Sequence, residues 1–255
     1  MDKHVCSDRR ARSSVIGTPI DSLSWSQALT RLAGWVAARE SCYVCICNVH
    51  SVVTAHQDQT FAKVIREAAM ATPDGFPVAW LMRHLGVAGQ ERINGPDLMW
   101  HYCAEAARRG EAIYLYGGMP QTLEMLQRKL LDEFPGLTIA GACSPPFRQL
   151  TVEEDAAVVE AINASGAGTV WVSLGCPKQE QWMAEHCGRI KAVMIGVGAA
   201  FDYHAGTIHR APLWMQRNGL EWLHRVCSEP RRLWKRYLVT NTLFLVHAGR
   251  QLLGR

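Results

Sequence analysis

Apolar runs of strand length alternate with amphipathic segments of helix length along most of this chain. Five apolar runs are predicted to be strands: residues 43–48, 112–116, 137–142, 169–174 and 192–197. Seven segments have helical periodicity: residues 24–38, 60–70, 76–85, 96–108, 121–134, 153–163 and 178–186. Because strands and helices alternate, we predict an α/β fold with a Rossmann-like, mostly parallel sheet that carries helices on both faces. The periodicity does not determine the order of the strands.

The two ends of the chain depart from this pattern. Residues 1–20 are polar and are predicted to be a poorly ordered lead-in to an α/β domain of residues 21–210. Residues 211–255 are predicted to be a short helical appendage, in which prolines and glycines separate short helical pieces from a longer helix that begins near Arg231. That helix is basic at its start and amphipathic, so it can lie in a membrane interface or pack on the body of the protein.

The composition is that of a globular protein, since 48% of the 255 residues are hydrophobic and 20% are charged. The net charge of +4 is unevenly distributed, because residues 225–255 contain seven Lys or Arg against one Glu. The rest of the chain is therefore slightly acidic. A basic tail on such a body favours a phosphate-bearing partner or an anionic surface. No nucleic-acid partner is expected.

The cysteines and the N-terminus indicate the compartment. Nine cysteines are scattered along the chain, and Cys42, Cys45 and Cys47 fall in a predicted buried strand with no second Cys/His pair at zinc spacing. We therefore expect free thiols in a reducing cytosol and no metal site. The first ten residues lack the apolar core of a signal peptide, and no run of about 20 apolar residues follows. A cytoplasmic protein, soluble or peripherally bound to a membrane, is expected.

The most informative segment is Val172-Ser-Leu-Gly-Cys-Pro-Lys-Gln-Glu-Gln-Trp182. An apolar run ends at Gly175, and a helix that starts at a proline then opens with Lys178, Gln179 and Glu180. In an α/β domain this arrangement presents polar side chains at the carboxyl edge of the sheet, where such domains bind ligands. We therefore expect these three side chains to contact a substrate.

Two further polar residues are candidates for the edge of the sheet. Asp74, in Thr72-Pro-Asp-Gly75, is either a turn aspartate or a general base on a loop at the edge of the sheet. Asn48 ends the first strand, where its amide can hydrogen-bond sugar hydroxyls or cap the next helix. Both interpretations stay open for each residue.

A phosphate-bearing ligand is indicated by glycines and by basic residues. Gly117 and Gly118 lie between a strand and a helix, where backbone can approach a ligand or form an ordinary turn. They do not complete a G-x-G-x-x-G fingerprint, and no acidic residue follows at ribose-binding spacing, so no nicotinamide or flavin cofactor is expected. No Asp-x-Asp pair follows a strand, so side chains rather than Mg²⁺ are expected to neutralise a diphosphate. The candidate cations are Arg210, Arg225, Arg231, Arg232 and Lys235.

In this order, several motifs are typical of one family: Thr72-Pro-Asp-Gly75, Glu91-Arg-Ile-Asn-Gly-Pro-Asp97, Gly117-Gly118, Gly175-Cys-Pro-Lys-Gln-Glu180, Gly206-Thr-Ile-His-Arg-Ala-Pro212, Gly219-Leu-Glu-Trp222 and Glu229-Pro-Arg-Arg232. The chain resembles the WecG/TagA/CpsF glycosyltransferases from about residue 43 to residue 237. The resemblance implies an inverting, metal-independent transfer of a sugar, N-acetylmannosamine or a related one, from a UDP-sugar to a polyprenyl-diphosphate-linked saccharide. Such a step belongs to bacterial surface polysaccharide or teichoic acid synthesis.

The resemblance also assigns roles to residues. Asp74 matches the proposed catalytic base, Asn48 and Gln179 match polar pocket residues, and Arg225 and Arg232 match arginines that close over the nucleotide diphosphate. The appendage of the family is linked to association with the inner leaflet of the cytoplasmic membrane. Two departures are Ile46, where many members have a hydroxyl residue, and Lys235, where an arginine is common. The first bears on sugar specificity and the second on a bidentate diphosphate contact.

Three alternatives remain at this point. The enzyme can be a glucuronosyl- or hexosyltransferase of exopolysaccharide assembly. A nucleotide-dependent oxidoreductase is disfavoured by the missing dinucleotide fingerprint. A non-catalytic sensor of sugar nucleotides would keep Gly117, Gly118 and the arginines but would tolerate replacement of Asp74.

Overall fold

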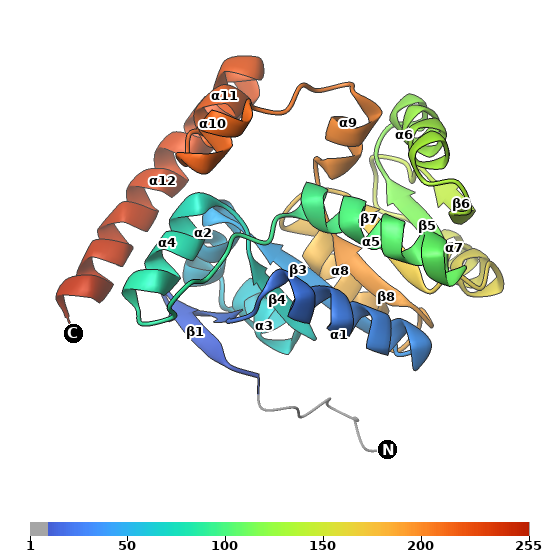
Figure 1. The fold of residues 1–255 in the computed structure, drawn as a ribbon, viewed down its shortest axis with the longest axis horizontal. Coiled ribbons are helices and arrows are strands. Elements are labelled where there is room, and N and C mark those ends of the chain that lie inside the picture. The colour runs from blue at the N-terminus through green and yellow to red at the C-terminus, as the bar shows by residue number, and fades with distance from the viewer. Residues whose placement is uncertain (1–9, 255) are drawn as a thin grey trace.

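A six-stranded parallel sheet forms the centre of the structure, a computed structural model that describes residues 10–254 except for the side chain of Arg232 (Figure 1). From one edge to the other the strand order is β4-β3-β8-β7-β5-β6, and neighbouring strands are parallel throughout. The strands are β3 (Cys42–Cys47), β4 (Met70–Pro73), β5 (Ala112–Gly117), β6 (Thr138–Cys143), β7 (Thr169–Ser173) and β8 (Val193–Gly196). The predicted α/β fold with a Rossmann-like sheet is thus confirmed.

Helices cover both faces of the sheet, and Figure 1 shows α1 and α5 on one side of it and α8 on the other. The helices of the α/β part are α1 (Trp25–Ala37), α2 (Val49–Gln57), α3 (Gln59–Glu67), α4 (Phe76–His84), α5 (Gly95–Arg109), α6 (Pro120–Glu133), α7 (Val152–Ala164), α8 (Lys178–His186) and α9 (Ala200–Ala205). All seven predicted helices are present. The predicted helix 60–70 ends early, because the last of those residues starts β4.

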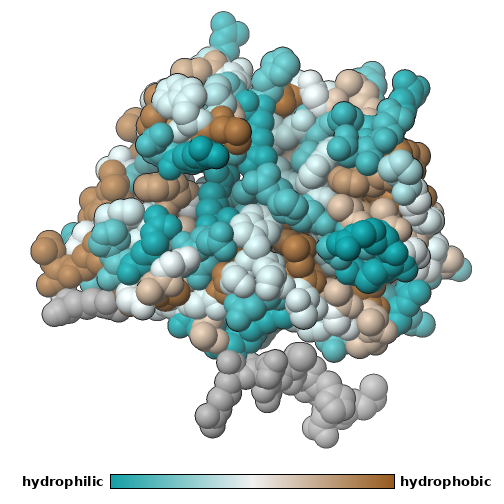
Figure 2. All heavy atoms as spheres, viewed as in Figure 1, coloured by the Kyte–Doolittle hydropathy of each residue, from teal (hydrophilic) through white to brown (hydrophobic). Residues whose placement is uncertain are grey.

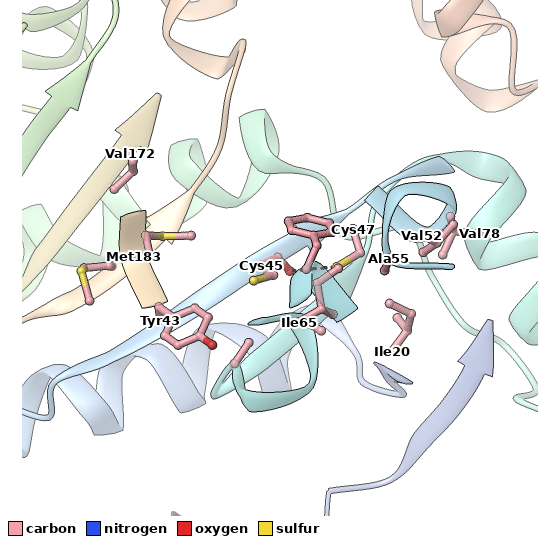
Figure 3. Close-up of a cluster of buried hydrophobic side chains, with 14 of the residues drawn as sticks. Ile20, Tyr43, Cys45, Cys47, Val52, Ala55, Ile65, Val78, Val172 and Met183 are labelled. Carbon is pink, nitrogen blue, oxygen red and sulfur yellow. Dashed lines mark hydrogen bonds between the residues drawn. The ribbon is translucent and has the colours of Figure 1, made fainter. Parts of the chain in front are cut away.

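The two faces of the sheet make two separate cores, because successive side chains of a strand point to opposite faces. In β7, Trp171 packs with α1, α5 and α6, whereas its neighbours Val170 and Val172 pack on the side of α2, α3 and α8. Cys45 and Cys47 are buried in the second core among aliphatic and aromatic side chains (Figure 3). Burial raises the pKa of both thiols, so they are protonated core residues, in agreement with the prediction of free cysteines.

The predicted lead-in was wrong for its second half, because β1 (Arg12–Val15) and β2 (Thr18–Asp21) form an antiparallel hairpin. Residues 1–9 lie outside the described residues. The side chain of Asp21 is fully buried and pairs with Arg10 at 3.6 Å and Arg12 at 3.3 Å. Its second oxygen accepts a hydrogen bond from the backbone N–H of Ala71 in β4 at 2.7 Å. These long-range contacts fix the hairpin beside the sheet.

Three helices follow the α/β part: α10 (Leu213–Arg217), α11 (Glu221–Ser228) and α12 (Pro230–Leu253). In Figure 1, α12 runs along the outer side of the molecule. Its second half is packed on the body, since Phe244 and Ala248 join the core beside α2. The side chain of Gln251 accepts a hydrogen bond from Ile16 N at 2.8 Å and donates one to Ser14 O at 2.6 Å. None of the helices in the described residues has the length and apolarity to cross a bilayer.

Candidate active site

The carboxyl ends of the parallel strands meet at one edge of the sheet, and a cavity of about 1350 Å³ lies there. In the sheet, β4 lies on one side of β3, and β8, β7 and β5 lie on the other side of β3. Ligands of open α/β sheets bind in the crevice that such a reversal creates. Loops from five strands reach the cavity, through Asn48, Asp74, Gly118, Gly175 and Gly198. In the space-filling view, hydrophilic residues gather between the C-terminal helices and the body (Figure 2).

Asp74 follows β4 directly and lines the cavity. Its position is fixed by its backbone N–H, which donates to the carbonyl of Cys47 at 2.9 Å. Gly75 then adopts a φ of +85° and turns the chain into α4. Burial raises the pKa of the Asp74 carboxyl, the nearby Arg92 guanidinium opposes that rise, and the Glu221 carboxylate adds to it. The result is a carboxylate with increased affinity for a proton, as a general base requires.

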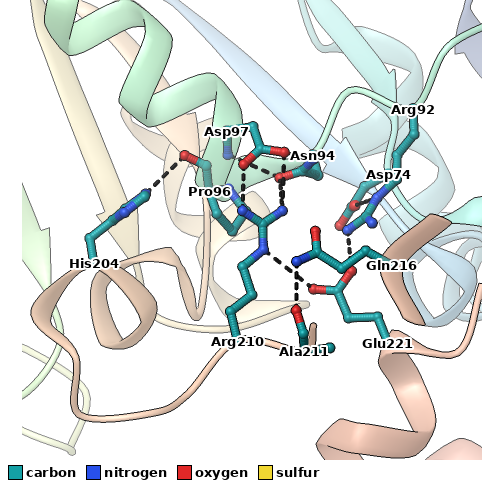
Figure 4. Close-up of polar contacts among 10 residues, drawn as sticks. All are labelled: Asp74, Arg92, Asn94, Pro96, Asp97, His204, Arg210, Ala211, Gln216 and Glu221. Atoms are coloured by element: carbon teal, nitrogen blue, oxygen red, sulfur yellow. Dashed lines mark hydrogen bonds and ion pairs between the residues drawn. The ribbon is translucent and has the colours of Figure 1, made fainter. Parts of the chain in front are cut away.

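Arg92 lies between two carboxylates, as Figure 4 shows. Its Nε is 3.4 Å from Asp74 Oδ1, and its Nη2 is 2.5 Å from Glu221 Oε2 at the start of α11. Sequence reasoning assigned no role to Arg92 or Glu221, although both stand in family motifs. Only those motifs could have indicated them, because the two residues are far apart in the sequence.

Arg210 belongs to the same group of charges and is not among the residues that line the cavity. Its guanidinium forms an ion pair with both oxygens of Asp97 and donates to Asn94 Oδ1 at 3.3 Å. Its Nε lies 3.8 Å from Glu221 Oε1. Arg210 was a candidate for diphosphate binding, but here it contacts Asn94 and Asp97 at the start of α5 and Glu221 (Figure 4).

The segment that opens α8 contributes all three of its predicted residues to the cavity: Lys178, Gln179 and Glu180. The Gln179 amide is fixed at both ends, since it donates to Glu180 Oε1 at 2.9 Å and accepts from Gly198 N at 3.1 Å. A β-carbon on Gly196 would lie 2.7 Å from Met183 Cε and 3.1 Å from the Gln179 amide nitrogen, so the glycine leaves room for both side chains. Lys178 is exposed at the cavity wall.

Asn48 and the paired glycines shape the opposite side of the cavity. Asn48 Oδ1 caps α2 by accepting from Ser51 N at 3.1 Å, so its amide nitrogen is the group that can donate to a ligand. Gly118 lines the cavity. Gly117 has a φ of +109°, and a β-carbon there would lie 2.3 Å from the carbonyl oxygen of Ser173. Gly117 therefore allows β5 and β7 to approach closely and brings Gly118 to the wall.

Among the described side chains of the C-terminal helices, two arginines reach the cavity: Arg225 and Arg236. Arg225 is only 8% exposed, with Glu229 Oε1 3.0 Å away and the ring of Tyr203 5.4 Å beneath its guanidinium carbon. Arg236 is near His50, whose pKa is lowered by burial and further by this positive charge. Arg236 was not among the predicted site residues, although it lies within the basic cluster that the sequence indicates.

The other three predicted tail cations are placed differently. Arg231 is exposed and is not among the lining residues. Lys235 is exposed, with its ammonium 5.5 Å from the ring of Trp234, and is not among the lining residues. Arg232 lies in α12, but its side chain is outside the described part of the structure. The diphosphate contact expected of Arg232 therefore stays a prediction.

The same cavity is also lined by α8 and by the loop before α7, which contributes Pro145, Pro146 and Phe147. The indole of Trp182 forms part of its wall and stacks on Tyr116, with ring centres 4.4 Å apart. The cavity thus extends beyond Asp74 and has room for a ligand with several parts. Within residues 10–254, no group of three or more His, Cys, Asp or Glu is arranged to hold a metal ion.

A comparison with known protein families agrees with this geometry. The model of the family described as "Glycosyl transferase WecG/TagA/CpsF family" matches residues 13–255, which is nearly the whole chain.

Proposed function

Because this chain belongs to the WecG/TagA/CpsF glycosyltransferase family, whose members act in cell-surface polysaccharide synthesis, we propose that it is an inverting, metal-independent UDP-sugar transferase. The acceptor is a polyprenyl-diphosphate-linked saccharide. The donor carries N-acetylmannosamine or a related sugar, with a glucuronosyl or hexosyl donor as the alternative. In this proposal residues 21–210 form the catalytic unit and residues 211–255 an appendage that completes it.

The observation that carries the proposal is the placement of Asp74, because this carboxylate shares one cavity with Gln179 from α8 and Arg225 from α11. An inverting transfer needs one base and no protein nucleophile. Asp74 takes the proton from an acceptor hydroxyl while that oxygen bonds to the anomeric carbon. The bond from the anomeric carbon to UDP breaks on the opposite side, and its electron pair leaves on the diphosphate.

The cations at the cavity support the second half of this step. Negative charge grows on the diphosphate as the bond breaks, and Arg225 and Arg236 offer guanidinium groups from the C-terminal helices. Arg225 is largely desolvated, which strengthens its interaction with an anion. Asn48 and Gln179 hold the sugar in this scheme, since both present amide groups at the wall.

The test is Asp74→Asn, assayed with radiolabelled UDP-sugar and a lipid-linked acceptor in buffer that contains EDTA. The amide keeps the size of the side chain but cannot accept the proton, so kcat should fall by roughly 10²–10⁴-fold. UDP binding, measured by calorimetry, should remain within a few fold. Asp132→Asn on the exposed surface of α6 is the matched control and should keep wild-type turnover.

Near-wild-type turnover of a folded Asp74→Asn variant would exclude Asp74 as the base. A wild-type protein that binds a UDP-sugar but releases no UDP, with or without a lipid-linked acceptor, would instead be a non-catalytic sensor. A screen of UDP-sugars by mass spectrometry, with a short-chain polyprenyl-diphosphate sugar as acceptor, identifies the donor.

A further inference from the structure

The candidate base is connected to the C-terminal helices by a continuous set of ion pairs (Figure 4). Asp74 contacts Arg92, and the same guanidinium contacts Glu221, the first residue of α11. Glu221 comes from a part of the chain that follows the whole α/β domain. Glu221, a residue of the appendage, therefore contacts Arg92, the guanidinium that neutralises Asp74.

The three side chains are held tightly. Those of Asp74, Arg92 and Glu221 are only 18%, 20% and 21% exposed, so solvent screens their interaction weakly. The backbone also packs closely here, because a β-carbon on Gly219 would lie 2.8 Å from the ring of Phe76, two residues after Asp74. The turn before α11 thus rests directly on the catalytic loop.

Glu221 is held on both sides. Its Oε2 contacts Arg92, while its Oε1 faces Arg210, which is itself paired with Asp97 on α5. The carboxylate is thereby fixed at a defined distance from Arg92. This arrangement differs from a flexible surface ion pair, in which long side chains sample many positions.

We propose that Glu221 is a positioning residue for the transfer: by sharing Arg92 with Asp74, it sets how far the base is neutralised once α10 and α11 are docked on the catalytic loops. The inference rests on the proposed role of Asp74 as the base. It adds a function for the appendage, which would tune the base as well as bind the diphosphate.

The direction of the effect follows from the charges around Asp74. The positive charge of Arg92 favours the ionised form of Asp74. The negative charge of Glu221 disfavours that form, both by direct repulsion and because it partly neutralises Arg92. Among the described residues, Tyr203, Tyr237 and the thiol of Cys47 also interact with Asp74. Removal of the Glu221 charge leaves Asp74 and Asp97 as the carboxylates that act on Arg92, and it lowers the affinity of Asp74 for a proton.

The experiment is the pH profile of kcat and kcat/KM for Glu221→Gln. The acidic limb should move to lower pH, because Asp74 ionises more readily. Since a less basic group accepts a proton less well in the transition state, the plateau value of kcat should fall by roughly 3–10-fold while KM for the donor stays within about twofold. Glu221→Asp keeps the charge but withdraws it, so its acidic limb should lie between those of the wild type and Glu221→Gln.

The exposed Glu124→Gln on α6 is the control and should leave the profile unchanged. An acidic limb of Glu221→Gln that is unchanged, or that moves to higher pH, would overturn the inference. If Glu221→Gln does not fold, Glu221→Asp replaces it and must shift the limb in the same direction. An inactive Asp74→Asn together with an unshifted Glu221→Gln would remove only this inference, whereas an active Asp74→Asn would remove the proposed function itself.

Discussion

At the scale of single residues, Glu180 is a second carboxyl group in an unusual state. It lines the cavity but is only 1% exposed, and burial raises its pKa to about 7. Hydrogen bonds from Gln179 and from the Cys176 thiol oppose the shift without cancelling it. Near neutral pH the side chain is therefore partly protonated, and its neutral form can donate a hydrogen bond to a ligand.

This shift makes stability depend on pH with a defined sign. A carboxyl group whose pKa is raised by folding contributes stability that is full below its unfolded pKa and is lost as pH rises through the folded value. For Glu180 the loss falls between the model-peptide value of 4.5 and about 7. The amide of Glu180→Gln does not ionise, so the variant should lose roughly 2–3 kcal/mol less stability than the wild type between pH 4 and pH 8.

Urea unfolding at the two pH values measures this difference. The exposed Glu160→Gln on α7 is the control and should follow the wild type. Identical pH dependence in the wild type and Glu180→Gln would show that Glu180 is ionised without cost in the folded protein.

Sequence reasoning placed some residues at the site and missed others. The two groups differ in how far apart in the sequence their contacts lie. Asn48 and Gln179 follow predicted strands, and parallel strands bring their carboxyl ends together, so local pattern was sufficient to place them at this edge. Asp74 follows β4, a strand that the sequence did not predict, and its role was indicated by the family motif. Arg92 and Glu221 have a role only as a pair, through a contact between α11 and the segment before α5. No local pattern encodes such a contact.

At the scale of elements, the hairpin of β1 and β2 is an example of structure that long-range contacts create. Each strand has only four residues, and the turn at Gly17 is a weak signal in a polar segment. By contrast, α8 has the predicted bounds because its start is marked by a glycine, a proline and polar residues. β4 was hidden because it follows α3 almost without a loop.

The hairpin is expected to depend on Asp21. This fully buried carboxylate joins Arg10, Arg12 and the backbone of Ala71. Its removal takes the counter-charge from two guanidinium groups, which still donate to backbone carbonyls, and removes the acceptor of the Ala71 N–H. Asp21→Ala should lower the free energy of unfolding by roughly 3–5 kcal/mol, the range for breaking a buried pair on one side. Chemical denaturation measures the change, with the exposed Asp132→Ala as control. A loss below about 1 kcal/mol would show that the hairpin is held by its apolar contacts instead.

At the scale of the whole molecule, the sequence predicted the layers but not the strand order. β8 is the last strand in the sequence, but in the sheet it lies between β3 and β7. It therefore joins β3 and β4 to β7, β5 and β6. Such pairing is set by the packing of all helices together and leaves no local trace. The same holds for α12, whose packing on α2 depends on residues almost 200 positions apart, such as Val52 and Phe244.

The outer face of α12 leads to the last prediction. Trp234, Leu238 and Leu245 are 47%, 61% and 70% exposed, and their spacing places them on one side of the helix. The exposed cations Arg231 and Lys235 lie at the same end as Trp234. Figure 2 shows hydrophobic residues along this edge of the molecule. An apolar stripe with adjacent cations suits the interface of an anionic membrane, where each cation adds about 1 kcal/mol.

We therefore expect the protein to co-sediment with vesicles that contain anionic lipid, more weakly with neutral vesicles and more weakly in high salt. Replacing Trp234, Leu238 and Leu245 with Ser should reduce binding at least tenfold, because about 0.8 kcal/mol is lost for each buried methylene. Leu131→Ser, which replaces a 49% exposed leucine on α6, should not change binding. If the triple variant instead changes the mass of the protein in solution while vesicle binding is absent throughout, the stripe covers a second copy of the chain, and access to a lipid-linked acceptor must come from another surface.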